Sequence, residues 1–385
     1  MPAKTKHQIA ALDALRAFAA LEVFFSHFRN LAFLDGHLLQ HPSFFIKAIY
    51  LMTSMGHSAV VVFFVLSGYL VGGSALSSFK RGWKWAPYLT NRLTRLFVVL
   101  LPAIVFGAVL DTVGTHFLSG HALYQGWGQE TVQGPVSSRL TLPIALGNLA
   151  FLQTILVPTF GSNGPLWSLA NELWYYMLFP LLLLAGYRNT SQIYRAGCLC
   201  LLGVILWSIG FPIAVEFPIW MIGAAIASRP TTLRIPNRIR RIGMAASILC
   251  MFAVAMFQHA IPANSVVVDY LLAVPCGVLI WIAHHRVHDG AESSWSHVVG
   301  WVASMSYTLY LTHLPAMVLL TALIVPGIRW TPDALHLLIG LCACSVIFAY
   351  STMLYWFFEY RTDAVRVLIK RLTSRNPVRS EIVSS

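Results

Sequence analysis

Four ionisable side chains, Asp13, Arg16, Glu22 and His27, lie within fifteen residues of a largely apolar stretch near the N-terminus. Arg16 and His27 are eleven residues apart, which places them on nearly the same face of an α-helix, roughly 16 Å apart along its axis. In that arrangement a guanidinium that binds anions and an imidazole that acts as a general base would face one cavity. The alternative also stays open: Asp13 and Arg16 form a helix-end ion pair, and His27 is a buried histidine with satisfied hydrogen bonds.

Further polar residues of catalytic type occur in three other apolar segments. Glu172 lies among aromatic residues, Ser306 and Tyr307 begin a row of hydroxyl side chains that ends at His313, and Glu359 follows a long apolar stretch. Carboxyl, hydroxyl and imidazole groups are costly in lipid and are therefore candidates for function. An interfacial aromatic belt, helix packing through small hydroxyl residues, and an end-of-helix ion pair are the structural alternatives.

Arg92 and Arg95 lie one helical turn apart at the start of an apolar segment. Two guanidinium groups at this spacing suit the oxygen atoms of a phosphate. Without other support, we favour ordinary positive charge flanking a membrane span as the explanation of this pair.

The cluster His284, His285, His288 and Asp289 contains residue types that bind metals. Its spacing does not match a closed set of ligands. We interpret it as part of a solvated loop and predict no metal site.

The elements that hold these residues must be membrane helices. The chain has 385 residues, of which 57% are hydrophobic and 10% charged, whereas a soluble domain has roughly 25% charged residues. Apolar stretches of about 20 residues are long enough to cross a bilayer. We therefore predict an all-α fold, a polytopic bundle of about ten transmembrane helices, with 144–160 as a short re-entrant or interfacial segment. The predicted spans are 11–34, 57–78, 96–118, 166–187, 196–214, 215–228, 242–261, 267–284, 299–321 and 335–358.

The net charge of +12 is distributed asymmetrically. If the N-terminus is cytoplasmic, the cytoplasmic segments contain 21 of the 26 lysines and arginines, which predicts that both termini are cytoplasmic. There is no basic patch with interleaved aromatic residues, so we predict no nucleic-acid partner. We expect one membrane domain over 1–360 and a basic juxtamembrane tail over 361–385 that contacts anionic membrane lipids.

Taken together, the motifs resemble those of the integral-membrane acyltransferase-3 family. The resemblance runs from residue 11 to about 360, in the order of the family. The matching motifs are Arg16-x₁₀-His27, Phe63-Phe64-Val65-Leu66-Ser67-Gly68-Tyr69, Arg92-x-x-Arg95, Trp167-Ser168-Leu169-x-x-Glu172-x-x-x-Tyr176 and Ser306-Tyr307-x-x-Tyr310-Leu311-x-His313-x-Pro315. Two positions depart from the family pattern: Ala14 replaces a common glycine, and Arg361 replaces the proline of an E-x-P motif, which makes the role of Glu359 less secure.

The resemblance implies an O-acyltransferase of the bacterial inner membrane that uses acyl-CoA, with acetyl-CoA as the commonest donor, and a carbohydrate or glycolipid acceptor. It implies that Arg92, Arg95 and Arg16 bind the donor. His27 would deprotonate the acceptor or accept the acyl group itself, and Glu172 or Glu359 would orient it.

The hydroxyl groups of Ser306 and Tyr307 would stabilise the oxyanion, and His313 would lie where the acceptor enters. Two other classes also place charged residues in a membrane: a proton-coupled transporter, which usually has an internal repeat that we do not find, and a glycosyltransferase that uses a lipid-linked sugar. The sequence does not identify the acceptor.

Overall fold

The computed structural model describes residues 6–126, 131–187, 189–230, 233, 235–257, 265–285 and 295–374. Within these ranges the chain forms α-helices, with short 3₁₀ and π turns and two isolated β-bridges but no strand. The all-α prediction is therefore confirmed. The helices are α1 (Lys6–Ala32), α2 (Phe44–Met52), α3 (Gly56–Ser67), α4 (Gly73–Lys80), α5 (Trp85–Phe117), α6 (Ala122–Gln125), α7 (Leu142–Leu149), α8 (Trp167–Gly186), α9 (Gln192–Ser228), α10 (Asn237–Phe257), α11 (Ser265–His284), α12 (Trp295–Ile324), α13 (Ala334–Phe357) and α14 (Thr362–Ser374).

Eight segments of the described chain are long and apolar enough to cross a membrane. This confirms the polytopic membrane architecture, whereas the span count of ten and the cytoplasmic location of both termini stay predictions. Helix α1 is not among the eight, because its charged residues are too closely spaced for a purely apolar span. Its polar face is instead turned toward the protein interior, where the side chains described below find partners.

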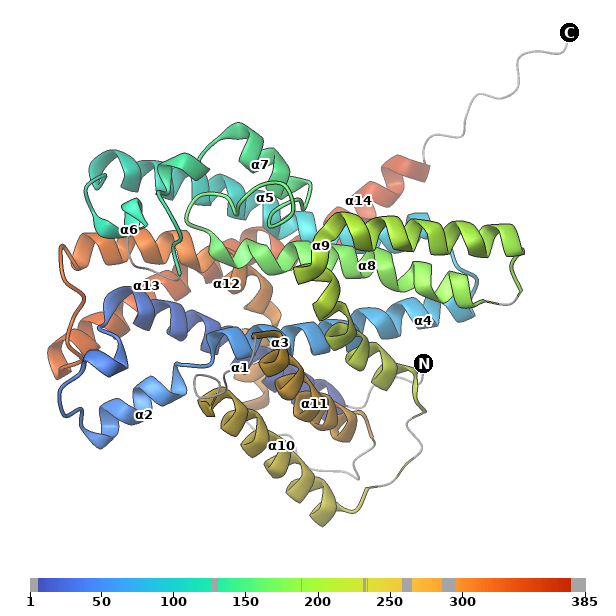
Figure 1. Cartoon of the computed structure of the whole chain (residues 1–385), viewed down its shortest axis with the longest axis horizontal. Helices are drawn as coiled ribbons and strands as arrows, with labels where there is room; N and C mark the ends of the chain where they lie inside the picture. The colour runs from blue at the N-terminus through green and yellow to red at the C-terminus, as the bar shows by residue number, and fades with distance from the viewer. Residues whose placement is uncertain are drawn as a thin grey trace, which may run out of the picture.

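Helix boundaries differ from the predicted spans in two informative places. The predicted spans 196–214 and 215–228 form one helical element, α9, which breaks at Gly210 with a φ of 76°, a value that favours glycine. Figure 1 shows the two arms of α9 running in different directions from this point. Helix α5 begins at Trp85, eleven residues before the predicted start, so that Arg92 and Arg95 lie within the helix.

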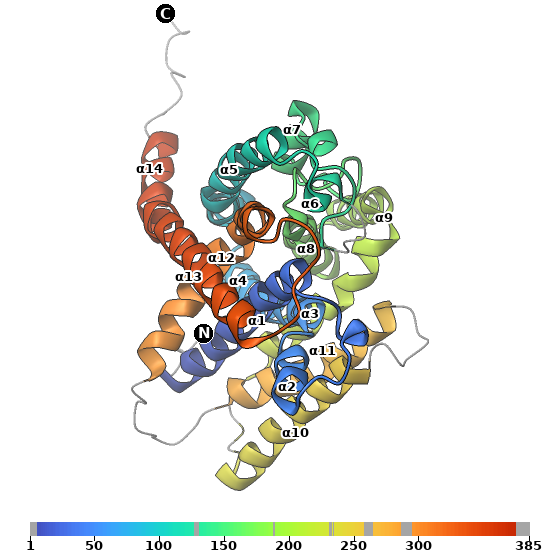
Figure 2. The same cartoon turned by 90° about the vertical axis from the view of Figure 1, so that its left-hand side faces the viewer.

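Helices α1, α3 and α12 form the centre of the bundle. Helix α1 packs against α3 and α12, α12 also contacts α5 and α13, and α3 contacts α9 and α11. Figures 1 and 2 show α10 and α11 side by side at one edge of the bundle, with α5, α6 and α7 at the opposite edge. The ionisable residues of α1 therefore lie between the two halves of the molecule.

A very close crossing fixes the end of α3 against α9. A Cβ atom on Gly68 would lie 1.8 Å from the carbonyl oxygen of Trp220, and one on Gly223 would lie 1.9 Å from that of Val65. Only glycine permits this approach. The helix widens into a π turn at Gly68–Gly72, a feature that often marks functional sites. The crossing brings Ser67 next to Trp220, whose Nε1 donates to the Ser67 Oγ at 3.1 Å.

Candidate active site

Three arginines from two helices face a single cavity of about 130 Å³, which we call the arginine cavity. Arg16 comes from α1, and Arg92 and Arg95 come from α5. The side chain of Arg95 is exposed although it lies between helices, because it faces this cavity. The polar residues that complete the lining are Ser67, Ser168, Glu172, Tyr176, Ser306, Tyr307 and Tyr310.

In the part of the chain that the structure describes, Arg92 is held by aromatic rings and not by a carboxylate. Its guanidinium carbon lies 5.7 Å from the ring centre of Tyr88 and 5.9 Å from that of Tyr176, at cation–π distance. Within the described chain its buried Nε has no hydrogen-bond partner. A buried donor of this kind normally has a partner, and the oxygen of an anionic ligand would supply one.

Glu172 is the acidic centre of the arginine cavity. Its Oε1 accepts hydrogen bonds from Ser67 Oγ at 3.3 Å and from the hydroxyl of Tyr176. Glu172 also lies within electrostatic range of Arg95 and Arg16. The glutamate therefore balances part of the positive charge of the cavity and positions the surrounding hydroxyls.

The other expected residues of this region are bonded to the backbone. Ser306 Oγ donates to the carbonyl of Ala303 at 2.7 Å and accepts from Arg16 at 3.5 Å. The Tyr307 hydroxyl donates to the carbonyl of Leu96 at 3.3 Å. In this structure both hydroxyl protons therefore point to backbone carbonyls.

Glu359 lies beside the middle of α12 and does not line the arginine cavity. Its Oε2 accepts from the Thr308 amide at 3.0 Å and from Thr308 Oγ1 at 2.6 Å. It lies within electrostatic range of Arg95 and Arg16. Its position beside α12 thus makes it a structural counter-charge for the arginines.

A second, larger cavity of about 490 Å³ contains His27, and we call it the histidine cavity. His27 Nδ1 lies 2.8 Å from Nε2 of His313, and the two rings are nearly parallel, with centroids 5.1 Å apart. The other nitrogen of His313, Nδ1, lies 2.8 Å from the carbonyl oxygen of Leu309. His313 is fully buried.

This chain of contacts fixes the tautomers of both neutral rings. A carbonyl oxygen only accepts, so the proton of His313 must be on Nδ1 and its Nε2 must accept. His27 Nδ1 is then the donor to His313, which leaves His27 Nε2 with a lone pair. The arrangement resembles that of a catalytic base held by an orienting partner, with a second imidazole in place of a carboxylate.

Val60 and Tyr310 line both cavities and so form the wall between them. The Tyr310 hydroxyl lies 2.8 Å from Ser168 Oγ, and its ring packs edge-on against Phe63 at 5.8 Å. Tyr310 belongs to a recognised motif, but its spacing alone did not distinguish it from Tyr307. The structure makes it the hydroxyl residue shared by the two cavities.

One side of the histidine cavity is non-helical backbone held by buried amides. The segment 144–160 forms α7 and then an irregular loop in which Thr154, a cavity residue, has a φ of 67°. A β-branched residue at this φ is a clear outlier. Asn148 donates to the carbonyl of Pro158 at 2.9 Å, and Gln153 donates to that of Leu166 at 2.8 Å. These bonds hold the strained wall in place.

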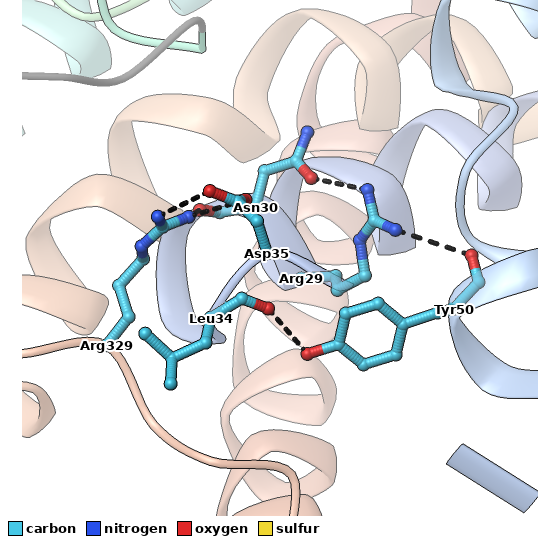
Figure 3. A network of polar contacts seen from close by, with 6 residues as sticks. All are labelled: Arg29, Asn30, Leu34, Asp35, Tyr50 and Arg329. Carbon is cyan, nitrogen blue, oxygen red and sulfur yellow. Dashed lines mark hydrogen bonds and ion pairs between the residues drawn. The ribbon is translucent and has the colours of Figure 1, made fainter. Parts of the chain in front are cut away.

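A polar network holds the C-terminal end of α1, as Figure 3 shows. Arg329 forms two bonds to Asp35, at 2.9 and 2.7 Å, and a third to the carbonyl of Asn30 at 3.2 Å. Arg29 donates to the Asn30 side chain at 2.6 Å and to the Tyr50 carbonyl at 3.3 Å. Asn30 lines the histidine cavity, so the network determines where its side chain lies.

The structure thus separates the predicted site residues into two groups. Arg16, Arg92, Arg95 and Glu172 meet in one cavity, and His27 lies in the other with His313 as its partner. The expectation that Glu172 or Glu359 orients His27 is not met, because these carboxyls are bonded to Ser67, Tyr176 and Thr308 instead. Sequence reasoning did not predict Tyr310, Ser168, His57 or Arg139 as site residues.

The interpretation of the histidine cluster at the end of α11 as a solvated loop was wrong for its first two members. His284 and His285 are buried, and His284 Nδ1 lies 2.8 Å from the Tyr69 hydroxyl. His288 and Asp289 lie outside the described residues. His284 therefore has a packing role beside the π turn.

The fold and the two cavities define a polytopic helical membrane protein with one cavity lined by arginines and one that contains a paired imidazole. The family model described as an acyltransferase domain, acyltransferase-3, matches residues 9–356, and the chain belongs to this family.

Two named relatives are similar over parts of their length. A Bacillus subtilis (strain 168) protein named "Putative peptidoglycan O-acetyltransferase YrhL" is 24% identical over 359 residues, covering 83% of this chain and 50% of that protein. A Streptomyces mycarofaciens protein named "Acyltransferase MdmB" is 27% identical over 175 residues, covering 45% of this chain and 39% of that protein. The chain thus spans half or less of the length of these relatives. No solved structure matches it.

Proposed function

We propose that this chain is a membrane O-acyltransferase that moves an acyl group, most simply acetyl, from acyl-coenzyme A to a hydroxyl of a carbohydrate or glycolipid acceptor. One observation carries the proposal: a cavity lined by three arginines and a cavity that contains a paired imidazole share the wall residues Val60 and Tyr310. The names of the relatives, one an O-acetyltransferase of peptidoglycan and one an acyltransferase, support the reaction class and a surface glycan as acceptor.

The arginine cavity is the donor side. Coenzyme A is an anionic molecule, and guanidinium groups bind its phosphates well. Arg92, with an unpartnered buried Nε, and Arg95, exposed toward the cavity, are the principal contacts, with Arg16 deeper. A cavity of about 130 Å³ suits the thin thioester arm better than the nucleotide. The distribution of basic residues supports a cytoplasmic location for this side.

The histidine cavity is the acceptor side, and His27 is the base. His27 Nε2 takes the proton of the acceptor hydroxyl, whose oxygen attacks the thioester carbonyl carbon. The carbon–sulfur bond breaks, and the leaving thiolate takes the proton from His27. His313 holds the orientation of His27 and accepts the hydrogen bond of its Nδ1–H throughout. Tyr310, in the shared wall, positions Ser168 through the hydrogen bond between their hydroxyls.

The first test follows label from radiolabelled acetyl-coenzyme A into protein and glycan in inverted membrane vesicles supplied with envelope extract. Removing a general base lowers the rate by about 10²–10⁴-fold, so His27→Ala abolishes transfer in practice. His116→Ala, at an exposed histidine on α5 outside both cavities, retains it. Label that stays on His27 in the absence of acceptor would indicate that the reaction proceeds through an acyl-histidine intermediate and not through direct attack by the acceptor hydroxyl.

The paired variant Arg92→Gln/Arg95→Gln tests the donor side in the same vesicles. Loss of charge-assisted hydrogen bonds, each about 1.5–3 kcal/mol, raises the KM for acetyl-coenzyme A by at least tenfold and leaves the acceptor KM unchanged. Arg81→Gln removes an exposed arginine outside the cavity and serves as the control. Folded wild-type protein that neither transfers label nor releases coenzyme A from any common acyl donor would refute the proposal and favour a transporter.

A further inference from the structure

The ionisable side chains that line the histidine cavity are of one kind, basic and not acidic. Its described lining includes Arg139, His57 and His27 but no aspartate or glutamate. Hydroxyl and amide groups from Ser26, Asn30, Thr131, Thr159 and Gln133 line the rest, together with the ring of Trp167. Hydroxyls, amides and one indole suit a sugar, and the volume of about 490 Å³ lies in the usual range for a small-ligand site.

Arg139 supplies net positive charge to this cavity. It follows the loop after α6, in the short turn Ser137–Arg139, and burial lowers its pKa from the ordinary value. Within the described chain no hydrogen bond or ion pair engages its guanidinium. Its backbone carbonyl accepts from the Gly161 amide at 3.2 Å, which fixes the turn against the strained loop. A positioned guanidinium without a carboxylate partner is well suited to an anion.

His57 adds a directed nitrogen from α3. Its Nε2 lies 2.9 Å from Asp269 Oδ1, with the His57 side chain 49% exposed and that of Asp269 3%. Because the carboxylate only accepts, Nε2 is a donor to Asp269. Nδ1 has no hydrogen-bond partner in the described structure, so it is left for a ligand.

The groups around His57 come from three neighbouring helices. Asp269 is on α11, Glu216 on α9 lies within electrostatic range of both, and Asn171 on α8 donates to Glu216 at 2.8 Å. Trp167 lies nearly parallel to the imidazole at 6.2 Å. Since Asp269 balances a protonated His57, the pair contributes a donor with little net charge, and Arg139 provides the charge of the cavity.

We propose that the histidine cavity is selective for an acceptor with a negatively charged group, a carboxylate or a phosphate, which Arg139 binds with His57 as a second contact. The inference rests on the proposed function and adds the class of acceptor to it. Because His27 lines the same cavity, an acceptor anchored at Arg139 presents a neighbouring hydroxyl to His27 Nε2. Neutral glycans lack that anchor.

Matched probes separate charge from shape. One pair is an oligosaccharide of alternating glucuronic acid and N-acetylglucosamine and the same oligosaccharide with each carboxyl reduced to the alcohol. The other pair is a mannose disaccharide with and without a 6-phosphate, which distinguishes phosphate from carboxylate as the preferred anion. Binding is measured by calorimetry with the full chain in neutral-lipid nanodiscs.

We expect the charged member of at least one pair to bind about 10- to 100-fold more tightly than its neutral partner. Arg139→Gln reduces this preference to less than about threefold, Arg139→Lys keeps most of it, and His57→Gln reduces it by an intermediate factor. Lys47→Gln, at an exposed lysine of α2 outside the cavity, leaves it unchanged. The preference also weakens as salt rises.

Equal binding of charged and neutral members by the wild type, or no binding of any probe, would overturn the inference. The same preparation is assayed for coenzyme A release that depends on His27. Release that persists while the anion preference is absent overturns the acceptor class alone. An anion preference with no release refutes the proposed transferase and leaves an anion-selective glycan site.

Discussion

The arginine cavity and the histidine cavity hold their functional side chains in different ways. In the first, Arg92 rests on the rings of Tyr88 and Tyr176, and its contacts are adaptable. In the second, His27 is fixed through His313 to a backbone carbonyl of α12. Binding a flexible anionic donor tolerates adjustable contacts, whereas proton transfer requires one nitrogen at one position. This contrast fits the proposed function, in which binding and chemistry are divided between the cavities.

The largest expected effect that tests this division is at His313. His313→Ala removes the acceptor for His27 Nδ1–H, so the imidazole loses its fixed tautomer and orientation. We expect kcat to fall by about 10²-fold, with the KM values for donor and acceptor within twofold of wild type.

His313→Gln provides the discriminating control, because its side-chain oxygen can accept the same hydrogen bond. Partial recovery of kcat in this variant supports a positioning role for His313. A large rise in the donor KM of His313→Ala would instead mean that the cavities are not functionally separate.

The sequence predicted the arginine cavity better than the histidine cavity, for a physical reason. Helical spacing relates residues within one helix, so it placed Arg16 and His27 on one face of α1 and Arg92 and Arg95 one turn apart on α5. The prediction that Arg16 and His27 face one cavity was wrong, because they line different cavities. Each motif also predicted that the polar face of its helix is turned toward the interior of the protein. Membrane hydropathy predicted the all-α architecture. It did not locate the break of α9 at Gly210, because that break depends on the backbone φ angle of a single residue.

The contacts that the sequence did not predict join distant segments. His57 and Asp269 are 212 positions apart, and His27 and His313 are 286 apart. No periodicity links such positions, and only the packing of α1, α3, α11 and α12 brings them together. Asp269 on α11 and Glu216 on α9, acids that are costly in membrane helices, are a signal in the sequence that could have indicated a second polar site.

Substitution of Tyr310 should reduce the transfer rate less than substitution of His313, because Tyr310 belongs to the wall that the two cavities share. Tyr310→Phe loses the hydrogen bond with Ser168, about 0.5–1.5 kcal/mol, so transfer slows by about 2- to 10-fold. Ser168→Ala should cause a loss of similar size, and the double variant should lose no more than either alone if the two hydroxyls act together.

Tyr310→Ala removes the wall itself. We expect more acetyl-coenzyme A hydrolysis in the absence of acceptor, since water then reaches the thioester. Coenzyme A release without glycan labelling measures it. Hydrolysis at the wild-type rate would show that Val60 and the neighbouring rings separate the cavities without Tyr310.

The smallest expected effect is on thermal stability. It concerns the polar network at the C-terminal end of α1 and depends on pH. Hydrogen bonding to Arg329 lowers the pKa of Asp35 below its ordinary value of 3.8. A carboxyl with a lowered folded-state pKa stabilises the protein above its unfolded-state pKa, and that stabilisation is lost as the pH falls through the folded-state value. Because Asp35 is partly exposed, the pair contributes only about 0.2–1 kcal/mol. Asp35→Asn should therefore lower the thermal unfolding midpoint slightly at pH 6 and hardly at all near pH 3. For the separate measurement of the acceptor KM, Asp333→Asn is the control: it lies at the exposed cap of α13 and should leave that KM unchanged. An acceptor KM that rises in Asp35→Asn alone would link the network at Asn30 to binding in the histidine cavity, and an equal midpoint loss at both pH values would contradict the assigned ion pair.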